Sequence, residues 1–367
     1  MALRTPLILN QTSGRIEELA AGDTLFGSYI EGLLGKNLLI NGDMSIFQRG
    51  TLANRPDGEG YTIDRWSFAS LGTGTSNWGV GTFTVSDSSP ILPVPSPPRY
   101  WLGLNIAAGT NTAWLRQKIE KVAVYHNGKA TLSFWMRSGV AGKKVGVRII
   151  QDFGGGTGAS AAVFIEGTVF TLTTSFQKYT YTFDVPPIDG KTLGSAPSGN
   201  DCLQVLFDFA APTGYGGQLV GQAGLFEVAM VQFERGAVAT EFDRRPDAVE
   251  LALCQRYYEK SYNLAISPGT VTRIGGHTSG LLSGYLLHYP TVRFSQRKRT
   301  VPAITVYNTS DGTAGQLAEN GGDGVHRVNH PALVDYVGSM SFEVIVQNGT
   351  AGVGNIARFQ WTADAEI

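Results

Sequence analysis

Residues 37–66 read NLLINGDMSIFQRGTLANRPDGEGYTIDRW, and this stretch says most about the fold. A run of apolar residues leads into Asn41-Gly42, a pair that is typical of a tight turn between two strands. An alternating apolar segment follows, and after a loop that contains glycine and proline we expect a second strand around Trp66. The stretch therefore predicts the opening of a β-sandwich.

The alternation of apolar and polar residues continues through residues 37–245, which we predict to form one large β domain. Phe134 and Met136 would lie on one side of a strand and Trp135 on the other. Similar alternation recurs at residues 145–149, 179–185, 203–209 and 226–230. Connections rich in Gly, Pro and Ser separate these runs, with no helical pattern between them. We therefore expect an all-β protein whose main domain is an antiparallel β-sandwich.

Three further segments surround this domain. Residues 1–36 are too few to bury their own apolar side chains, so we expect them to serve oligomerisation or attachment. Residues 246–262 change to a helical period with apolar stripes on two sides, which predicts a short connecting helix. Residues 263–367 return to alternating runs bounded by Asn-Gly, Asp-Gly and Pro, which predicts a C-terminal β-sandwich domain.

The composition argues against several classes of protein. Charged residues make up 16% of the 367 residues and the formal net charge is −1, so we expect no nucleic-acid partner. Apolar runs stay well short of the roughly 20 residues that cross a bilayer, so we expect no membrane insertion. The two cysteines, Cys202 and Cys254, predict neither a disulfide framework nor a zinc site, and they fit synthesis in a reducing cytoplasm.

Sequence motifs for catalysis are missing, and we therefore expect no enzyme activity. The Gly-x-Ser-x-Gly motif of serine hydrolases does not occur in the sequence. The Gly-Lys-Thr at residues 190–192 lacks the first glycine of a phosphate-binding loop. His326 and His330 have the spacing of two metal ligands on a helix, but their neighbours predict a loop.

The opening stretch also resembles the module that begins many bacteriophage tail-fibre and tail-associated proteins. The residues that carry this match are Asn41, Gly42, Gln48, Arg49, Gly50, Asp64, Arg65 and Trp66. The later segments VAMVQFERGAVATEFDRRP, PDAVELALCQRYYEKSY and TADAEI are similar to parts of the same proteins. The resemblance implies a jelly roll like those of carbohydrate-binding modules, followed by a C-terminal β tip domain.

The resemblance also implies a place and a function. The chain would belong to the virion tail and be made in the host cytoplasm, with residues 1–36 attached to other tail proteins. It would form a homotrimer. The first hypothesis is a tail fibre or receptor-binding protein that recognises a host cell-surface glycan, with a polysaccharide as partner. The alternatives are a purely structural tail, collar or baseplate component without sugar binding, and a polysaccharide depolymerase.

Aromatic side chains are the candidates for glycan binding, because the apolar face of a sugar ring stacks on a flat ring. The candidates in the sandwich are Trp78, Trp101, Trp114 and Trp135. Trp135 is the first choice as an exposed ring, since the alternation directs it away from Phe134 and Met136. For each ring taken singly, packing in the core is the simpler interpretation.

Resemblance to jelly-roll carbohydrate-binding modules further implies a structural calcium ion near the first strand. Asn41 and Asp43 in the opening turn, with Glu234 or Asp243 near the closing strand, would supply the oxygen ligands. Asn41 and Asp43 can equally form a turn by hydrogen-bonding to nearby backbone. We expect no cofactor other than this ion.

Overall fold

The computed structural model describes residues 7–10, 15–18, 35–55, 57–83, 94, 97–195, 199–280, 286–288, 291–347 and 355–367. The chain divides into two compact units, residues 1–36 and residues 37–367. In the first unit, β1 (Leu7–Asn10) pairs antiparallel with β2 (Arg15–Glu18). Residues 1–6, 11–14 and 19–34 of this unit lie outside the described residues. The attachment role expected for residues 1–36 therefore stays a prediction.

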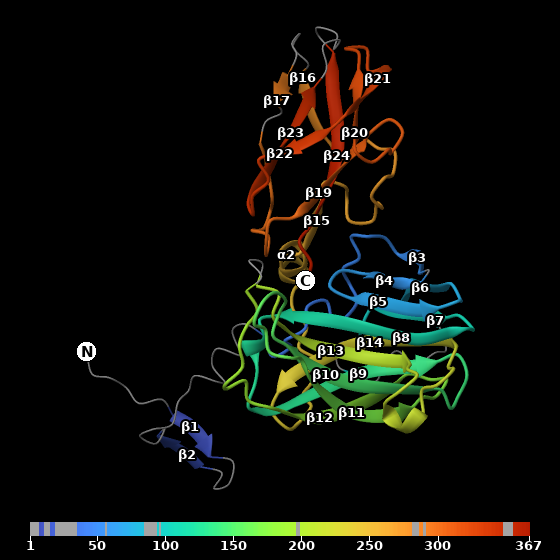
Figure 1. Ribbon diagram of the computed structural model, residues 1–367, viewed down its shortest axis with the longest axis vertical. Helices are drawn as coiled ribbons and strands as arrows, with labels where there is room; N and C mark the ends of the chain where they lie inside the picture. The colour runs from blue at the N-terminus through green and yellow to red at the C-terminus, as the bar shows by residue number, and fades with distance from the viewer. Residues whose placement is uncertain are drawn as a thin grey trace. The chain divides into compact units, whose positions relative to one another are not determined.

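The second unit begins with a β-sandwich of two antiparallel sheets, each of six strands among the described residues (Figure 1). The first sheet has the order β11-β10-β13-β8-β5-β4, and the second sheet has the order β12-β9-β14-β7-β6-β3. The strands of the first sheet are β4 (Gly58–Tyr61), β5 (Ser67–Gly72), β8 (Thr110–Glu120), β10 (Lys144–Asp152), β11 (Val163–Thr171) and β13 (Cys202–Ala210).

The strands of the second sheet are β3 (Leu52–Arg55), β6 (Ser76–Thr82), β7 (Tyr100–Ile106), β9 (Gly128–Ser138), β12 (Gln177–Val185) and β14 (Gly224–Arg235). Two short 3-10 turns accompany them, at Val122–Val124 and Tyr215–Gly217. The antiparallel pairing throughout confirms the all-β class and the jelly-roll sandwich.

The core of the sandwich lies between the two sheets and follows the alternation seen in the sequence. Phe134 of β9 is fully buried, and its ring meets that of Phe207 of β13 edge-on at 4.8 Å between centroids, so the two sheets are joined by aromatic contact. Trp66 and Trp78 are also buried in this core. Each such side chain removed from water contributes about 1.5–3 kcal/mol to the free energy of folding.

The first part of the opening stretch does not form the strands that its sequence predicts. Residues 37–50 consist of turns and irregular backbone, whereas the strand expected around Trp66 is present as β5, which begins at Ser67. Asn41 and Met44 have left-handed backbone, with φ angles of 57° and 61°. Such angles lie outside the β region, so the expected pair of strands at residues 38–46 is wrong.

Side-chain hydrogen bonds explain why this stretch stays out of the sheets. The Asn41 side chain donates to the carbonyl oxygens of Ile46 and Asp64, at 2.7 and 3.0 Å, and accepts from the Ile46 amide at 2.9 Å. These bonds satisfy backbone groups that a neighbouring strand would otherwise satisfy. Gly42 lies directly on β14, where a Cβ atom would come within 2.2 Å of the Val231 carbonyl oxygen.

One helix, α2 (Asp247–Gln255), follows the sandwich within the described residues. It is shorter than the connecting segment predicted at residues 246–262, because Tyr258–Lys260 forms β15 instead. All three residues of β15 are buried and pair with β24 (Ile356–Asp364). No helix in the described part of the chain is long and apolar enough to span a membrane.

The remaining strands form a C-terminal β-sandwich domain. One sheet has the order β15-β24-β20-β21, with β16 and β19 also paired to β24; the other has the order β17-β23-β18, with β22 also paired to β23. Their bounds are β16 (His277–Gly280), β17 (Leu286–His288), β18 (Val292–Arg293), β19 (Ala303–Asn308), β20 (Gln316–Asn320), β21 (His326–Pro331), β22 (Leu333–Asp335) and β23 (Ser341–Gln347). Phe342 and Trp361 meet in their shared core at 5.4 Å.

The segment that contains His326 and His330 is the strand β21, so the loop predicted there is wrong. His330 is buried, and its Nε2 atom lies against the Glu319 carboxylate of β20. Pairing between β20 and β21 outweighs the turn-forming residues around the two histidines, because the backbone hydrogen bonds of the strand are satisfied by its neighbour.

Residues of the opening stretch join the sandwich to the end of the chain. Arg65 forms an ion pair with Glu366, and its guanidinium carbon lies 3.5 Å from the centre of the Tyr257 ring. The Gln48 side chain donates to the Tyr258 carbonyl oxygen at 2.8 Å. Several residues that carry the resemblance therefore have a structural role at this junction, where cation–π contact adds to the ion pair.

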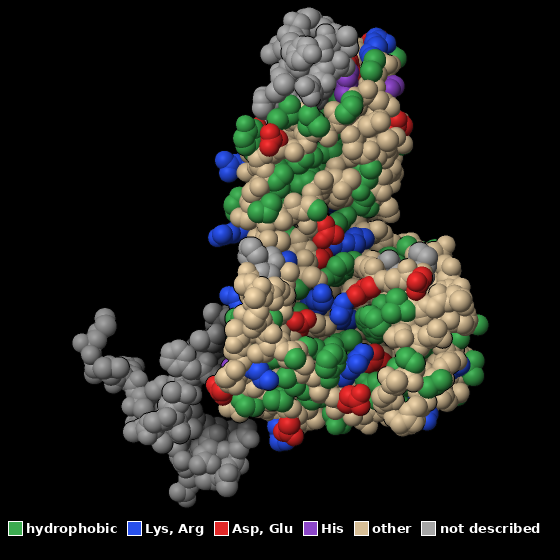
Figure 2. All heavy atoms as spheres, in the orientation of Figure 1, with side chains coloured by type: hydrophobic (Ala, Val, Ile, Leu, Met, Phe, Trp, Pro, Cys, Tyr) green, Lys and Arg blue, Asp and Glu red, His purple; other side chains and the backbone are tan. Residues whose placement is uncertain are grey.

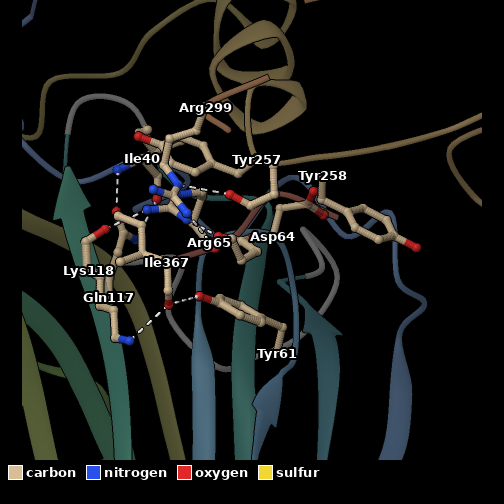
Figure 3. Close-up of polar contacts among 12 residues, drawn as sticks. Ile40, Tyr61, Asp64, Arg65, Gln117, Lys118, Tyr257, Tyr258, Arg299 and Ile367 are labelled. Atoms are coloured by element: carbon tan, nitrogen blue, oxygen red, sulfur yellow. Dashed lines mark hydrogen bonds and ion pairs between the residues drawn. The ribbon is translucent and has the colours of Figure 1, made fainter. Parts of the chain in front are cut away.

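The last residue takes part in the same junction. The Tyr61 hydroxyl and the Lys118 ammonium both donate to a carbonyl oxygen of Ile367, at 3.3 and 2.9 Å (Figure 3). Basic and acidic side chains lie interspersed on the face drawn in Figure 2, and neither sign gathers there alone. Electrostatic attraction by itself therefore does not select a ligand on that face.

Candidate functional site

The outer face of the second sheet carries a tryptophan that rests on glycine. Trp101 of β7 points away from the core, since its neighbour Leu102 is buried between the sheets. A Cβ atom on Gly81 of β6 would lie 1.9 Å from the Trp101 ring, and one on Gly103 would lie 2.9 Å from it. The indole therefore lies against the backbone of β6 and β7, and its other side is directed away from the sheet.

Polar side chains share this outer face with Trp101. Asn77 of β6 lies opposite Asn105 of β7, and Gly103 lies opposite Glu227 of β14. Glu227 is buried and forms an ion pair with Arg137 of β9. Side chains of this kind donate and accept hydrogen bonds from hydroxyl groups. We call the surface made by Asn77, Trp101, Asn105, Arg137 and Glu227 the Trp101 face.

Trp135, the first choice as an exposed ring, points to the same outer side but is only 8% exposed. It packs with Ala229 and Met230 of β14. Partly buried side chains from distant segments lie against this cluster, namely Phe83, Val94, Trp101, Phe176 and Phe242. The alternation predicted correctly that the Trp135 side chain points away from the core. It could not predict that this side chain is buried by residues far away in the sequence.

The other two candidate rings lie elsewhere. Trp78 is 2% exposed and belongs to the core between the sheets. Trp114 is half-buried on β8 of the first sheet, with the Arg116 guanidinium 6.0 Å from its ring centre. The structure therefore brings Trp101 and Trp135 to one face and separates them from Trp78 and Trp114.

Sequence reasoning did not select the polar residues of the Trp101 face. Asn77 and Asn105 belong to strands that the sequence left unassigned, within residues 67–130. Glu227 and Arg137 alternate with core residues along their strands. This alternation could have predicted that both side chains point away from the core. Which outward residues meet depends on the register of three strand pairs, β6–β7, β7–β14 and β9–β14.

The expected calcium ligands have other partners. The Asn41 side chain makes three hydrogen bonds in the turn described above. Asp43 forms an ion pair with Arg244 at 2.9 Å and accepts a hydrogen bond from Ser45. Glu234 accepts hydrogen bonds from the Thr240 amide and hydroxyl, at 2.9 and 2.7 Å.

The calcium site that the resemblance implied therefore stays a prediction. The carboxylate of Asp243, the alternative to Glu234, accepts a hydrogen bond from the Asn37 amide at 3.4 Å. Among the described residues, no group of three or more His, Cys, Asp or Glu side chains could hold a metal ion.

Comparison with known proteins gives structural likeness at low identity. No protein-family model and no curated protein sequence matches the chain. A domain of bacteriophage CBA120 tailspike protein 4 is similar to this chain at 15% identity and a TM-score of 0.32. The similarity covers 55% of this chain and 21% of the tailspike chain, so the chain spans about a fifth of that protein.

Two carbohydrate-binding modules give comparable values. The family 11 module of Clostridium thermocellum, solved with a β-1,3-1,4-mixed-linked tetrasaccharide, has 15% identity and a TM-score of 0.29, covering 52% of this chain and 99% of its own. The CBM22-2 xylan-binding domain of Paenibacillus barcinonensis Xyn10C has 15% identity and a TM-score of 0.30, covering 47% and 92%. Likeness this distant leaves the function to be argued from the geometry.

Proposed function

We propose that this chain is a carbohydrate-binding protein and that the Trp101 face holds a stretch of polysaccharide. The observation that carries the proposal is the Trp101 ring, held against Gly81 and Gly103 with its other side directed outward. A sugar ring has an apolar face that stacks on such a ring and hydroxyls that need donors and acceptors at its edge. Asn77, Asn105 and the Arg137–Glu227 pair supply those groups.

The proposed activity is binding without catalysis. Glycosidases use two carboxyl groups that flank the bond they cleave. Among the residues of the Trp101 face, Glu227 is the single carboxylate, and it is engaged in the ion pair with Arg137. The arrangement supports recognition of a chain rather than its cleavage.

We further propose that the protein acts in a bacteriophage tail and recognises a glycan on the host surface. The opening stretch, the closing strand of the sandwich and the C-terminal TADAEI support this proposal through their resemblance to tail-fibre proteins. In this role residues 1–36 attach to other tail proteins and the chain assembles as a homotrimer within the virion. The host polysaccharide is the partner of the Trp101 face.

The carbohydrate proposal is tested by binding of the purified chain to an array of bacterial and plant polysaccharides. The variant Trp101→Ala should weaken binding about tenfold or more, which corresponds to about 1.4 kcal/mol of lost contact. Trp114→Ala is the matched control, because Trp114 is also half-buried but lies on the first sheet. Equal losses in both variants, or no polysaccharide bound by the wild-type chain, would contradict the proposal.

The tail proposal has a separate test. Purified chain is added to candidate host bacteria before infection, and free phage are counted after adsorption. Saturable competition that the Trp101→Ala variant loses is the expected result. Binding to polysaccharide without any competition would leave a carbohydrate-binding protein and remove the receptor role.

A further inference from the structure

A pocket of about 530 Å³ lies where four distant segments of residues 37–367 meet. These segments are the opening stretch, the start of β7, the start of α2 and the turn after Tyr262. Its described lining residues are Asp43, Ser45, Ile46, Phe47, Arg99, Tyr100, Arg244, Asp247, Ala248, Leu251, Leu264 and Ala265. They differ from the residues of the Trp101 face, so this is a second candidate site. Its volume falls in the range of pockets that hold small ligands.

Part of the pocket lining is aromatic and apolar. The Phe47 and Tyr100 rings meet edge-on with 5.3 Å between their centroids, and both are half-buried. Leu251 of α2 and Leu264 from the following turn add aliphatic surface. Such a lining suits a ligand that has an apolar face about as large as one ring.

The rest of the lining is polar and balanced in charge. Asp43 and Arg244 form an ion pair at 2.9 Å, and the Ser45 hydroxyl donates to Asp43 at 2.8 Å. Arg99 and Asp247 are exposed, and the Arg99 guanidinium lies 5.5 Å from the Tyr100 ring centre. Two arginines and two aspartates leave no excess of either sign, so the lining favours a neutral ligand with several hydrogen-bonding groups.

We infer that this pocket binds a single neutral pyranose residue, such as the end of a glycan chain or a side branch. The inference builds on the proposed carbohydrate function but uses a different set of residues. The apolar face of the sugar would lie on the rings of Phe47 and Tyr100, while its hydroxyls meet the Asp43–Arg244 pair and Arg99. The Trp101 face would hold the length of a glycan and the pocket one of its terminal residues.

The test is titration of the full chain with methyl glycosides of glucose, galactose, mannose and rhamnose, followed by NMR or calorimetry. At least one glycoside should bind the wild-type protein. Ala265→Trp should fill the pocket and weaken that binding at least tenfold. Ala161→Trp is the matched control, since Ala161 is also an exposed alanine but does not line the pocket. Arg99→Ala, a change at an exposed side chain, should also weaken binding.

The outcomes separate this inference from the proposal for the Trp101 face. Binding of a neutral glycoside that Ala265→Trp loses and Ala161→Trp keeps would support the pocket, even if no polysaccharide binds the chain. Failure of every neutral glycoside to bind the wild-type protein would overturn it. Equal weakening by both tryptophan substitutions would overturn it as well.

Discussion

Gly81 decides whether Trp101 can lie on the second sheet. A side chain at this position would start 1.9 Å from the indole, and the backbone of β6 and β7 cannot move apart without losing their pairing. The flat ring of the candidate site therefore depends on a residue that has no side chain. Nothing in the order of residues 76–82 shows this, because the ring that covers Gly81 belongs to the neighbouring strand.

The substitution Gly81→Ala tests this dependence. The added methyl group should displace the Trp101 ring, and polysaccharide binding should weaken about tenfold while the sandwich stays folded. Array binding and circular dichroism measure the two effects. Gly155→Ala is the control, since a Cβ atom there meets nothing within 4 Å. Unchanged glycan binding in Gly81→Ala would contradict the role of the ring.

Asp64 is a second residue whose behaviour depends on its surroundings. Burial raises its pKa to about 6, although Arg49 and the hydrogen bonds from Gln48 oppose this shift. The pKa of an unfolded aspartate is near 3.9. The folded state therefore keeps the proton over a range of pH in which the unfolded state has lost it. Unfolding releases a proton there, and the folded state loses stability as the pH rises from about 4 to about 6.

The variant Asp64→Asn should lack this dependence. Relative to the variant, the wild-type free energy of unfolding should fall by up to about 3 kcal/mol between pH 4 and pH 6. Urea denaturation at several pH values measures both proteins, and their difference cancels the groups that they share. A constant difference over this range would show that Asp64 titrates normally.

At the scale of elements, each cysteine lies inside a regular structure. Cys202 begins β13, and burial raises the pKa of its thiol to about 11. Cys254 lies in α2, is fully buried, and has its pKa raised by the same cause. The thiolate is the reactive form of cysteine. Both thiols should therefore react slowly, because burial keeps reagents away from them and the raised pKa keeps them protonated.

We therefore expect neither thiol to react with an aromatic disulfide reagent in the native protein at pH 8 within minutes. Both should react in 6–8 M urea, where burial is lost, at the rate of free cysteine. Absorbance of the released thiolate counts the modified groups. Fast labelling of one thiol in the native protein would mean that β13 or α2 opens readily.

The end of α2 shows how one element limits another. Residues 246–262 have a helical period, yet the chain leaves the helix after Gln255 and pairs as β15 with β24. The partner strand lies about 100 residues later in the chain, as the register of Tyr258 with Asp364 shows. Backbone pairing with a distant strand outweighs the local preference, because it satisfies the hydrogen bonds of buried residues.

At the scale of the molecule, residues 37–367 form one compact unit, and charged side chains connect its two sandwiches. Arg65 and Glu366 pair with side-chain exposures of only 1% and 4%. Arg49 reaches Asp364 and Glu366 at 3.2 and 3.3 Å, and Arg256 reaches Glu120 at 2.8 Å. Removing one partner from such a buried pair leaves an uncompensated charge.

Glu366→Ala should therefore lower the free energy of unfolding by about 3–5 kcal/mol and separate the melting of the two sandwiches. Calorimetry of the full chain should show one main transition for the wild type and two for the variant. Asp323→Ala is the control, because its pair with Arg327 is exposed and screened by solvent, so its loss should change stability little. A single transition with unchanged stability in Glu366→Ala would contradict the coupling.

The sequence alone predicted the all-β class, the antiparallel sandwich and the inward direction of residues such as Phe134 and Met136. It could do so because alternation is a local property: neighbouring side chains on a strand point to opposite faces. The same rule directed Trp135 out of the core. It also predicted strands at residues 38–46. There the Asn41 side chain hydrogen-bonds to the backbone and holds a turn in place of a strand.

Which outward residues are covered, and which of them contact one another, depends on contacts that form in the folded protein. Trp135 is buried by side chains from distant segments, while Trp101 rests on Gly81 and faces outward. Asp43 and Glu234, which the resemblance implied as calcium ligands, contact Arg244 and Thr240. The alternation of apolar residues and their secondary-structure propensity depend on a few neighbours in the sequence. The burial of a side chain, its ion pairs and the register of its strand depend on residues about 20 to 300 positions away. Those contacts exist only once the chain has folded.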